Sequence, residues 1–420
     1  MNQLRAMQEN TETGTLQVVV TSRRQNTPIS NATITISYNG EPDSTLETVQ
    51  TDSSGQTQIL TLNAPPLAYS LDSSQANQPF SLYNIRIQAE GYHPLNISGI
   101  EILPTIKAIQ NALLTPIDSE RDAREDIDIP TNTLFGSYPP KIEEAEIKPL
   151  EESGEIVLSR VVIPEYVVVH DGPPTDSRAR NYYVRYKDYI KNVASSEIYA
   201  TWPDATIRAN VLAIMSFTLN RVYTEWYRNR GYNFTITSST AYDQKWSYGR
   251  TIYEPISRVV DEMFENYLSR PNVTQPILTQ YCDGRTVSCP NWLSQWGSKY
   301  LGDQGYSAIQ ILRNYYGSNM YINTADEISG IPSSWPGYNL SVGSSGSKVR
   351  QMQQQLNRIH QNYPAIPTVT PDGIFGNATR NAVRTFQSVF GLPPTGIVDY
   401  PTWYKISEIY VAVSRIAELN

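Results

Sequence analysis

The sequence predicts a multidomain α+β protein with an N-terminal all-β sandwich, a central α+β domain and a C-terminal three-helix module. Three observations predict this order. Short runs rich in Val, Ile, Thr and Tyr fill residues 14–116, helical periodicity starts only in the middle of the chain, and residues 340–410 hold short amphipathic helical stretches. The 420 residues suffice for two or three domains, and 40% hydrophobic with 18% charged residues is a globular composition.

The first segment, residues 14–116, has the pattern of half-buried strands. Ile34, Ile36 and Tyr38 alternate with polar residues in "ATITISY", and turn signals such as Asn39-Gly40 separate the runs. Roughly seven strands in about 100 residues favour a sandwich. The sequences "PISNATITI", "TDSSGQ" and "YNIRIQAEGYHP" together resemble the carboxypeptidase-regulatory-like, transthyretin-like β-sandwich. This resemblance implies a stalk or adhesion unit without catalytic residues.

Two segments read as connections, residues 117–156 and 326–339. The stretch from Asp118 to Glu155 holds 12 acids and 4 bases, an excess equal to the net charge of −8 of the whole chain. Its composition cannot bury enough apolar surface to fold alone, which predicts a linker or an extended strap. No basic patch is visible, so nucleic acid is not an expected partner. No apolar run of about 18 residues predicts a membrane span, and "MNQLRAMQENTETG" does not have the pattern of a signal peptide.

The central segment, residues 157–325, contains two helical patterns. In "KDYIKNVASSEIYA", Tyr189, Val193 and Glu197 recur at helical spacing and share one face. The next helix shows an amphipathic core stripe, formed by Ile207, Val211, Ile214, Thr218 and Val222. From spacing alone, Glu197 is more readily a solvated helix residue than a catalytic one, because glutamates are mostly exposed.

Residues 160–322 resemble the SpoIID/LytB family of sporulation lytic transglycosylases. The resemblance rests on "YIKNVASSEI", "WPDATIRANVLAIMSFTL", "STAYDQKW" and "LSQWGSKYLGDQGYSAIQILRNYYG", in the family's order. It implies that Glu197 is the catalytic acid, which protonates the glycosidic oxygen and then, as carboxylate, takes a proton from the sugar's 6-hydroxyl. It also implies substrate-binding roles for Tyr189, Asp243 and Gln295. A raised pKa would let one carboxyl serve both steps.

The same segment departs from the family pattern. Met215 stands where the family has Arg, and "CPNWLSQ" replaces a His- and Gly-containing stretch. Some relatives bind zinc in this region through Cys and His. Here Cys282 and Cys289 form a disulfide, two ligands of a partial zinc site, or free thiols; the disulfide is favoured for a wall-facing protein. We therefore expect no obligatory cofactor, with zinc as the alternative.

The last segment carries the most specific pattern. "SSGSKVRQMQQQLNRI" and "TPDGIFGNATRNAVRTFQSVFGLPPTGIVDYPTW" resemble the bacterial peptidoglycan-binding domain. Asp372-Gly373 marks a tight turn, because glycine tolerates the required backbone conformation. The resemblance implies a groove for glycan or stem peptide near this turn, with Asp372, Phe375 and Gln387 as candidate contacts. The competing interpretation is that all of these residues only hold the fold, and it is favoured for the aromatic residues Phe386 and Phe390.

These resemblances predict a protein that binds peptidoglycan in the cell wall and cleaves its glycan strands as a lytic transglycosylase. The alternative is a catalytically inactive peptidoglycan-binding structural protein of the spore coat or cell wall, so enzymatic activity stays open. Absence of a signal peptide pattern favours synthesis in the mother-cell cytoplasm and delivery to the spore layers. Peptidoglycan strands are the expected partners, together with other spore or cell-wall proteins.

Overall fold

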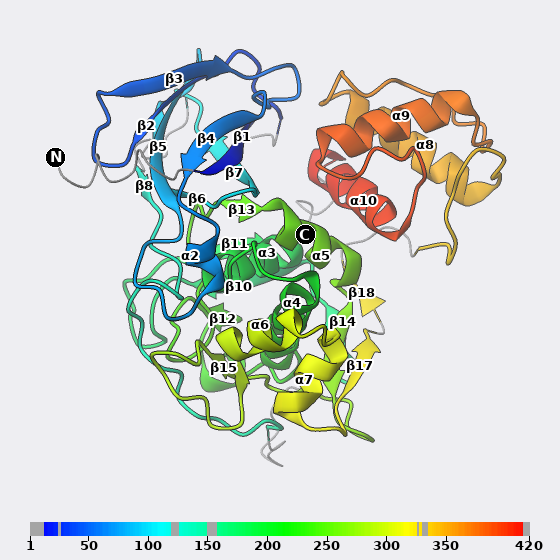
Figure 1. Cartoon of the computed structure of the whole chain (residues 1–420). Helices are drawn as coiled ribbons and strands as arrows, with labels where there is room; N and C mark the ends of the chain where they lie inside the picture. The colour runs from blue at the N-terminus through cyan, green and yellow to red at the C-terminus, as the bar shows by residue number, and fades with distance from the viewer. Residues whose placement is uncertain are drawn as a thin grey trace.

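The computed structural model describes residues 12–23, 27–118, 126–148, 158–325, 327–329 and 335–414. The chain is a multidomain α+β protein, and Figure 1 shows its three parts: a β-rich part in blue, a central part in green and yellow, and a helical part in orange and red. Among the described residues, no helix has the length and apolar character to cross a membrane. The N-terminal residues that bear on the signal-peptide prediction lie mostly outside the described part.

The N-terminal part contains two sheets around an aliphatic core. One has the strand order β3-β2-β5-β6-β8 and the other β13-β7-β1-β4. Alternation of buried and open positions along β5 shows the predicted period, because successive strand side chains point to opposite faces. The elements within the predicted sandwich are β1 (Glu12–Ser22), β2 (Thr33–Tyr38), β3 (Thr45–Gln50), β4 (Leu60–Ala64), α2 (Ala68–Leu71), β5 (Ser81–Gln88), β6 (Leu95–Ile102) and β7 (Lys107–Leu114).

Two strands of these sheets come from outside residues 14–116. Strand β8 (Ile127–Asp128) runs parallel to β6, and β13 (Ile252–Tyr253) runs antiparallel to β7. Strand β13 belongs in sequence to the central part. The sandwich and the central part are therefore joined by backbone hydrogen bonds as well as by the chain itself.

A buried ion pair closes the same junction. The guanidinium of Arg250 donates to Glu101 Oε2 at 2.5 Å, and both side chains are only 1% exposed. Arg250 also donates to the carbonyls of Pro130 and Ser195, each at 2.9 Å, while Glu101 Oε1 accepts the backbone N–H of Asn132 at 2.9 Å. Glu101 belongs to the sandwich, Pro130 and Asn132 to the segment that follows it, and Ser195 and Arg250 to the central part, so the cluster holds three segments together.

The segment between the two predicted domains is an extended strap over residues 130–148. Its backbone bonds to the central part, with the N–H of Ile142 donating to Ala241 O at 2.7 Å. The Gln280 side chain donates to Ile142 O at 2.7 Å and accepts the N–H of Glu144 at 2.9 Å. Of the two sequence interpretations, linker or extended strap, these residues form the strap. The neighbouring residues 119–125 and 149–157 lie outside the described part.

The central part is built around α4 (Asp204–Tyr223), which contacts α3, α5, α6, α7 and β14. The predicted single apolar stripe is wrong for α4, because this helix is buried on nearly all sides. Its buried polar side chains form hydrogen bonds with neighbouring segments, as Asn210 does with Ser298 and Ser216 with Ile277. Its neighbours are α3 (Tyr186–Glu197), α5 (Glu254–Met263), α6 (Gln295–Asp303), α7 (Ala308–Tyr316), the 3-10 turn η1 (Arg228–Arg230), β9 (Val162–Ile163), β10 (Tyr166–His170), β11 (Asn181–Arg185), β12 (Ile236–Thr237), β14 (Asn266–Ser269), β15 (Tyr281–Cys282), β16 (Leu293–Ser294), β17 (Tyr321–Thr324) and β18 (Glu327–Ile328).

The C-terminal part is a three-helix module, as the sequence predicts. Its helices are α8 (Ser347–His360), α9 (Asn377–Val389) and α10 (Tyr400–Ser414). Helix α10 lies against α5 and α3 through a group of buried charges, which we call the docking cluster: Lys187, Lys191, Asp261, Lys405 and Glu408. Within it, Lys187 bridges the two parts, with Nζ 3.1 Å from Asp261 and 2.7 Å from Glu408. Part of the predicted second linker, residues 326 and 330–334, lies outside the described residues.

Candidate functional site

Glu197 is the last residue of α3, and its side chain is 2% exposed. One carboxylate oxygen accepts a hydrogen bond from the backbone N–H of Lys245 at 2.7 Å, and the other accepts one from the Tyr281 hydroxyl. Burial raises the pKa of Glu197, while the nearby Lys141 ammonium and the two hydrogen bonds oppose that rise. The structure therefore buries this carboxyl, and burial favours its protonated form.

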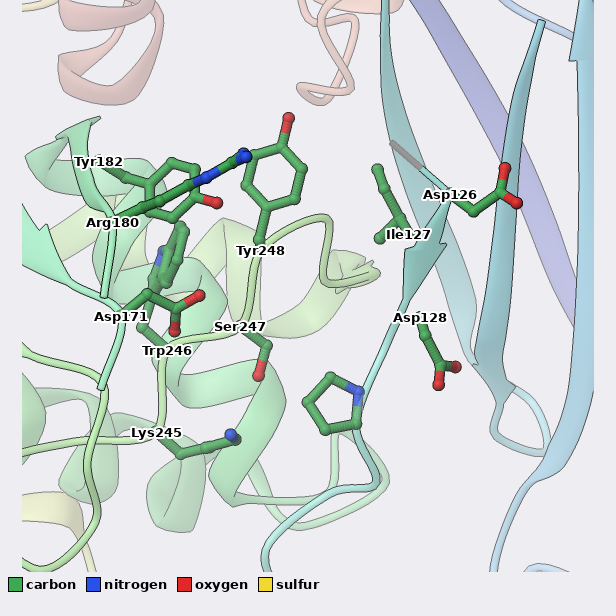
Figure 2. A pocket seen from close by; sticks show the side chains of 11 residues that line it. Asp126, Ile127, Asp128, Asp171, Arg180, Tyr182, Lys245, Trp246, Ser247 and Tyr248 are labelled. Atoms are coloured by element: carbon green, nitrogen blue, oxygen red, sulfur yellow. The ribbon is translucent and has the colours of Figure 1, made fainter. Parts of the chain in front are cut away.

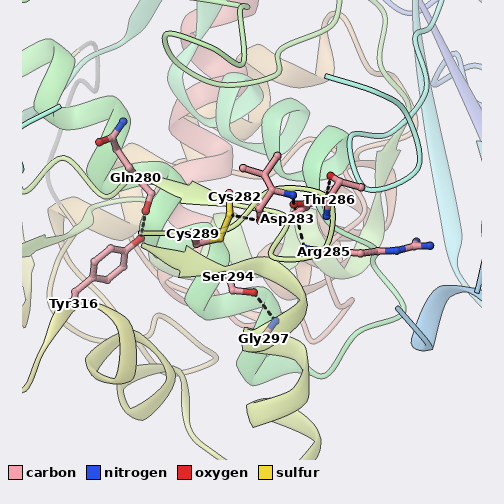
Figure 3. Close-up of a disulfide and its surroundings, with 10 residues drawn as sticks. Gln280, Cys282, Asp283, Arg285, Thr286, Cys289, Ser294, Gly297 and Tyr316 are labelled. Atoms are coloured by element: carbon pink, nitrogen blue, oxygen red, sulfur yellow. Dashed lines mark hydrogen bonds between the residues drawn. A yellow bond between two sulfur atoms is a disulfide. The ribbon is translucent and has the colours of Figure 1, made fainter. Parts of the chain in front are cut away.

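Tyr281 is held in place by a small disulfide-closed loop. Its strand β15 pairs in parallel with β16, and the next residue, Cys282, is bonded to Cys289 with the Cα atoms 5.7 Å apart. Figure 3 shows the loop between the two cysteines, in which the Asp283 carboxylate accepts backbone N–H groups, including that of Thr286 at 2.8 Å. The loop is thus closed by the disulfide at its ends and held by the hydrogen bonds of Asp283 within it, which fixes Tyr281 beside Glu197.

Of the three alternatives for the cysteines, the structure has the disulfide. Sulfurs bonded to each other are not thiolates, which are the form that ligates zinc. Among the described residues, no group of three His, Cys, Asp or Glu side chains is arranged to hold a metal. In this oxidised form the residues present do not fit a zinc site at the loop.

The strap covers Glu197. Tyr138, Pro139, Pro140 and Lys141 line a cavity of about 70 Å³ together with Glu197 and others. The Lys141 ammonium lies 4.4 Å from the centre of the Tyr281 ring and donates to the carbonyl of Asp243. Burial lowers the pKa of Lys141, and Glu197 acts in the opposite direction. Ligand pockets usually measure about 300–1,000 Å³, so this cavity has no room for a sugar ring while the strap is in place.

The other predicted residues of the central part are placed differently. Gln295 begins α6 and lines the Glu197 cavity. Tyr189 is fully buried and its hydroxyl donates to Gln244 at 3.1 Å. Asp243 is also fully buried and accepts from Arg221 at 2.7 Å and Tyr227 at 2.6 Å. In this arrangement neither Tyr189 nor Asp243 lines the cavity at Glu197, and both side chains bond within the protein interior. The substrate-binding role of these two residues stays a prediction.

The three predicted residues of the C-terminal module lie around its tight turn. Asp372 is at the surface, where its carboxylate accepts the N–H of Ile374 at 2.8 Å. Gly373 has a φ of 79°, which explains glycine at that position. Phe375 and Gln387 are buried, and Gln387 bonds Gly396 N–H and Ile397 O at 2.8 Å. Phe375 and Gln387 thus belong to the interior of the module, whereas Asp372 and Ile374 of the turn lie at its surface. The role of the three predicted residues as ligand contacts stays a prediction.

Sequence reasoning missed Lys141, Tyr281 and Lys245. Their positions depend on three segments that meet only in the folded chain, and no spacing relates them to Glu197. The one signal in the sequence is Lys141 itself, which is one of only 4 bases among the 12 acids of its segment. It directly follows two prolines and is one of two lysines in the strap, the other being Lys148.

Comparison with known proteins identifies the C-terminal module. Residues 345–406 match the family described as "Putative peptidoglycan binding domain". The chain therefore carries a peptidoglycan-binding domain at its C-terminus; the match spans less than half of the chain and does not extend to the central part. Over 76 residues the chain is 42% identical to the zinc D-Ala-D-Ala carboxypeptidase of Streptomyces albus G. This alignment covers 18% of this chain and 28% of that protein. The chain thus spans little more than a quarter of the length of this relative.

Solved structures give only faint similarity. A 3-chlorocatechol 1,2-dioxygenase from Rhodococcus opacus 1CP aligns with a TM-score of 0.18 at 13% identity, over 26% of this chain and 62% of that one. A catechol 1,2-dioxygenase from Acinetobacter sp. ADP1 aligns with a TM-score of 0.19 at 12% identity, over 29% of this chain and 59% of that one. Scores this low support no conclusion on fold or function. The SpoIID/LytB resemblance of the central part stays a prediction.

Proposed function

We propose that this protein works at the bacterial cell wall, which it binds through the peptidoglycan-binding domain. The observation that carries this proposal is the family match of residues 345–406. The surface turn at Asp372 and Ile374 is the proposed contact, since the Ile374 side chain is 58% exposed although it is aliphatic. Other spore or cell-wall proteins remain proposed partners, and the spore layers remain the proposed location, reached from the mother-cell cytoplasm.

A sedimentation assay with insoluble, purified peptidoglycan tests the binding. The full chain is expected in the pellet, and Ile374→Asp is expected to shift most of it to the supernatant. Ile322→Asp is the matched control, because Ile322 is also an exposed isoleucine, at 39%, but lies in β17 of the central part. Equal sedimentation of both variants would contradict the proposed contact, and no sedimentation of the wild-type chain would contradict the function.

At the finer level, we propose that the central part cleaves glycan strands by the lytic transglycosylase route. The protonated Glu197 gives its proton to the glycosidic oxygen as the bond to C1 breaks. The resulting carboxylate then takes the proton of the 6-hydroxyl, whose oxygen bonds to C1, giving a 1,6-anhydro end without consuming water. Its burial and its raised pKa support the first step, and the Tyr281 hydroxyl, which donates to the carboxylate, stabilises the ionised form needed for the second step.

The strap supports a second candidate, a catalytically inactive wall-binding structural protein. It leaves only the 70 Å³ cavity beside Glu197, and both carboxylate oxygens already accept hydrogen bonds. In the active form proposed here the strap must therefore leave the site before a strand enters. In the inactive form it stays in place and the central part serves as a scaffold.

Digestion of purified glycan strands, followed by mass spectrometry of 1,6-anhydro-muramic ends, separates the two candidates. We expect such ends from the wild-type chain and from the control Glu262→Gln, a half-buried glutamate of α5 outside the cavity, but none from Glu197→Gln. The variant Lys141→Ala, which removes a cavity-filling side chain of the strap, is expected to release more. If neither the wild-type chain nor Lys141→Ala produces anhydro ends while both bind peptidoglycan, the inactive candidate holds.

A further inference from the structure

A second, larger cavity lies between the sandwich and the central part. Its volume is about 340 Å³, which is within the range of small-molecule sites. Three segments line it: the strand β8 with its flanking residues, the β10–β11 hairpin, and the loop from Lys245 to Tyr248. Figure 2 shows these segments facing one another across the space. Because β8 is part of the sandwich sheet, the cavity exists only where the two parts meet.

One wall of this cavity is aromatic. The ring of Tyr182 stacks on that of Tyr248, with centroids 5.0 Å apart and an interplanar angle of 26°, and it lies 5.1 Å from the Trp246 ring. Tyr182 and Tyr248 are half-buried, so part of each ring is accessible. Stacked rings with polar tips offer an apolar face beside hydrogen-bonding groups. A pyranose ring has the matching construction, with C–H groups on its faces and hydroxyls at its edge.

The remaining walls carry donors and acceptors. The Ser247 hydroxyl and the Trp246 indole N–H are buried and have no hydrogen-bond partner within the described residues. Buried polar groups without partners are rare, and a bound molecule or an ordered water is one explanation for them. Asp171 and Asp128 have one oxygen each engaged by a serine, at 2.8 and 3.0 Å. In Figure 2 the Ser247 and Lys245 side chains project from their loop toward the strand that bears Asp128.

The charges in the cavity indicate a neutral ligand. Its acids are Asp126, Asp128 and Asp171, and its cations are Arg180 and Lys245. A site with both signs interspersed attracts neither a polyanion nor a polycation, whereas carboxylates and cations together suit several sugar hydroxyls and an amide. We propose that this cavity binds a neutral saccharide ring of the N-acetylhexosamine class, stacked on the Tyr182 and Tyr248 wall. The choice of this sugar class rests on the proposed peptidoglycan function; the saccharide chemistry rests on the cavity.

The cavity is adjacent to Glu197. The backbone N–H of Lys245 donates to the Glu197 carboxylate at 2.7 Å, while the Lys245 side chain lines the larger cavity. The Lys245 ammonium also lies 5.2 Å from the centre of the Tyr138 ring, which lines the smaller cavity. Tyr138 and Lys245 thus lie between the two spaces. A sugar in the larger cavity would sit next to the strap, on the side of Glu197 that faces the sandwich.

Titration of the full chain with the soluble trimer of N-acetylglucosamine, followed by tryptophan fluorescence, tests the proposal. Trp246 lies in the cavity wall, so saturable binding is expected to change its emission. Tyr248→Ala removes half of the stacked pair and is expected to weaken binding about tenfold or more, as loss of an aromatic contact does. Tyr248→Phe keeps the ring and loses only the hydroxyl that accepts from Arg23 at 2.8 Å, so its affinity should stay near that of the wild type.

The controls make the outcomes distinct. Tyr300→Ala removes a tyrosine that is 64% exposed and lies outside the cavity, and its affinity should not change. Circular dichroism and thermal unfolding show whether each variant is folded, and mass spectrometry shows that the trimer stays intact. Saturable binding that Tyr248→Ala leaves unchanged would overturn the proposal, as would no trimer binding by the wild-type chain. In that last case sedimentation with peptidoglycan would still stand, so failure of the cavity is separable from failure of the proposed function.

Discussion

Replacing Arg250 with methionine removes the cation of the buried pair at the junction of the sandwich and the central part. Methionine keeps much of the side-chain volume, so the change acts mainly on charge and hydrogen bonds. The Glu101 carboxylate, 1% exposed, would keep its hydrogen bond from Asn132 but lose the guanidinium at 2.5 Å. The carbonyls of Pro130 and Ser195 would each lose a donor.

The expected cost is about 3–5 kcal/mol, because removing one partner of a buried pair leaves an uncompensated buried charge. Arg258→Met is the matched control: it removes an arginine that is 37% exposed and pairs with Asp204 at 2.7 Å and Glu262 at 3.1 Å. Exposed pairs contribute only about 0–1 kcal/mol. The two variants should therefore differ by roughly 2 kcal/mol or more.

Differential scanning calorimetry measures both variants against the wild-type chain. Glu101→Gln and the double variant complete a double-mutant cycle, in which the second substitution should cost much less once the first is present. We expect the sandwich and the central part to unfold in one transition in the wild-type chain. Equal destabilisation by Arg250→Met and Arg258→Met, or purely additive single variants, would refute the description of this junction.

Three further predictions concern the site and the docking cluster. Burial raises the pKa of Glu197, so the contribution of this residue to stability is full below the pKa of an unfolded glutamate and is lost as pH rises through the folded pKa. The melting temperature of Glu197→Gln relative to wild type should therefore increase between pH 4 and 8. A difference in melting temperature that does not change with pH would contradict the burial. Burial acts to raise the pKa of Asp261, but Lys187, Lys191 and Lys405 together lower it to about 2. Its contribution of roughly 2 kcal/mol is therefore present at neutral pH and lost as pH falls from about 4 toward 2, and calorimetry should show that the penalty of Asp261→Asn shrinks over that window. Opening the short loop by Cys282→Ser together with Cys289→Ser should cost roughly 2 kcal/mol, and reductant should lower the melting temperature of the wild-type chain but not of the variant.

The sequence predicts those parts of the fold that depend on local periodicity. Ile34 and Ile36 alternate with polar neighbours and are buried, and the aliphatic face of α8 packs as its spacing indicates. Strands of two residues, such as β8 and β13, have no periodicity to detect, because their pairing is decided by the partner strand. The polar residues of α4 are a further case: Ser216 is a poor core residue by composition but donates to Ile277 O at 2.9 Å.

The candidate site follows the same division. The sequence places Glu197 near a helix end, and in the structure it is the last residue of α3 and is buried there. Its cover was not predictable, because an acidic segment with few aromatics resembles a solvated linker. Glu144 and Glu146 of this segment are neutralised by Arg221 and Arg270, each at 2.6 Å, and these pairs exist only after the central part has folded. Charge composition alone therefore does not distinguish a strap from a linker.

Strand β13 has a consequence for the order in which the chain can fold. Without it, β7 is the outer strand of its sheet, since β13 lies on the side of β7 away from β1. During synthesis the ribosome delivers Lys107–Leu114 long before Ile252–Tyr253. The residues of β7 that β13 pairs, Ala108 and Ile109, thus stay at an unpaired edge, which is a template for aggregation, until residue 253 has emerged. A chain ending at residue 118 should accordingly associate in sedimentation velocity experiments under conditions where the full chain does not.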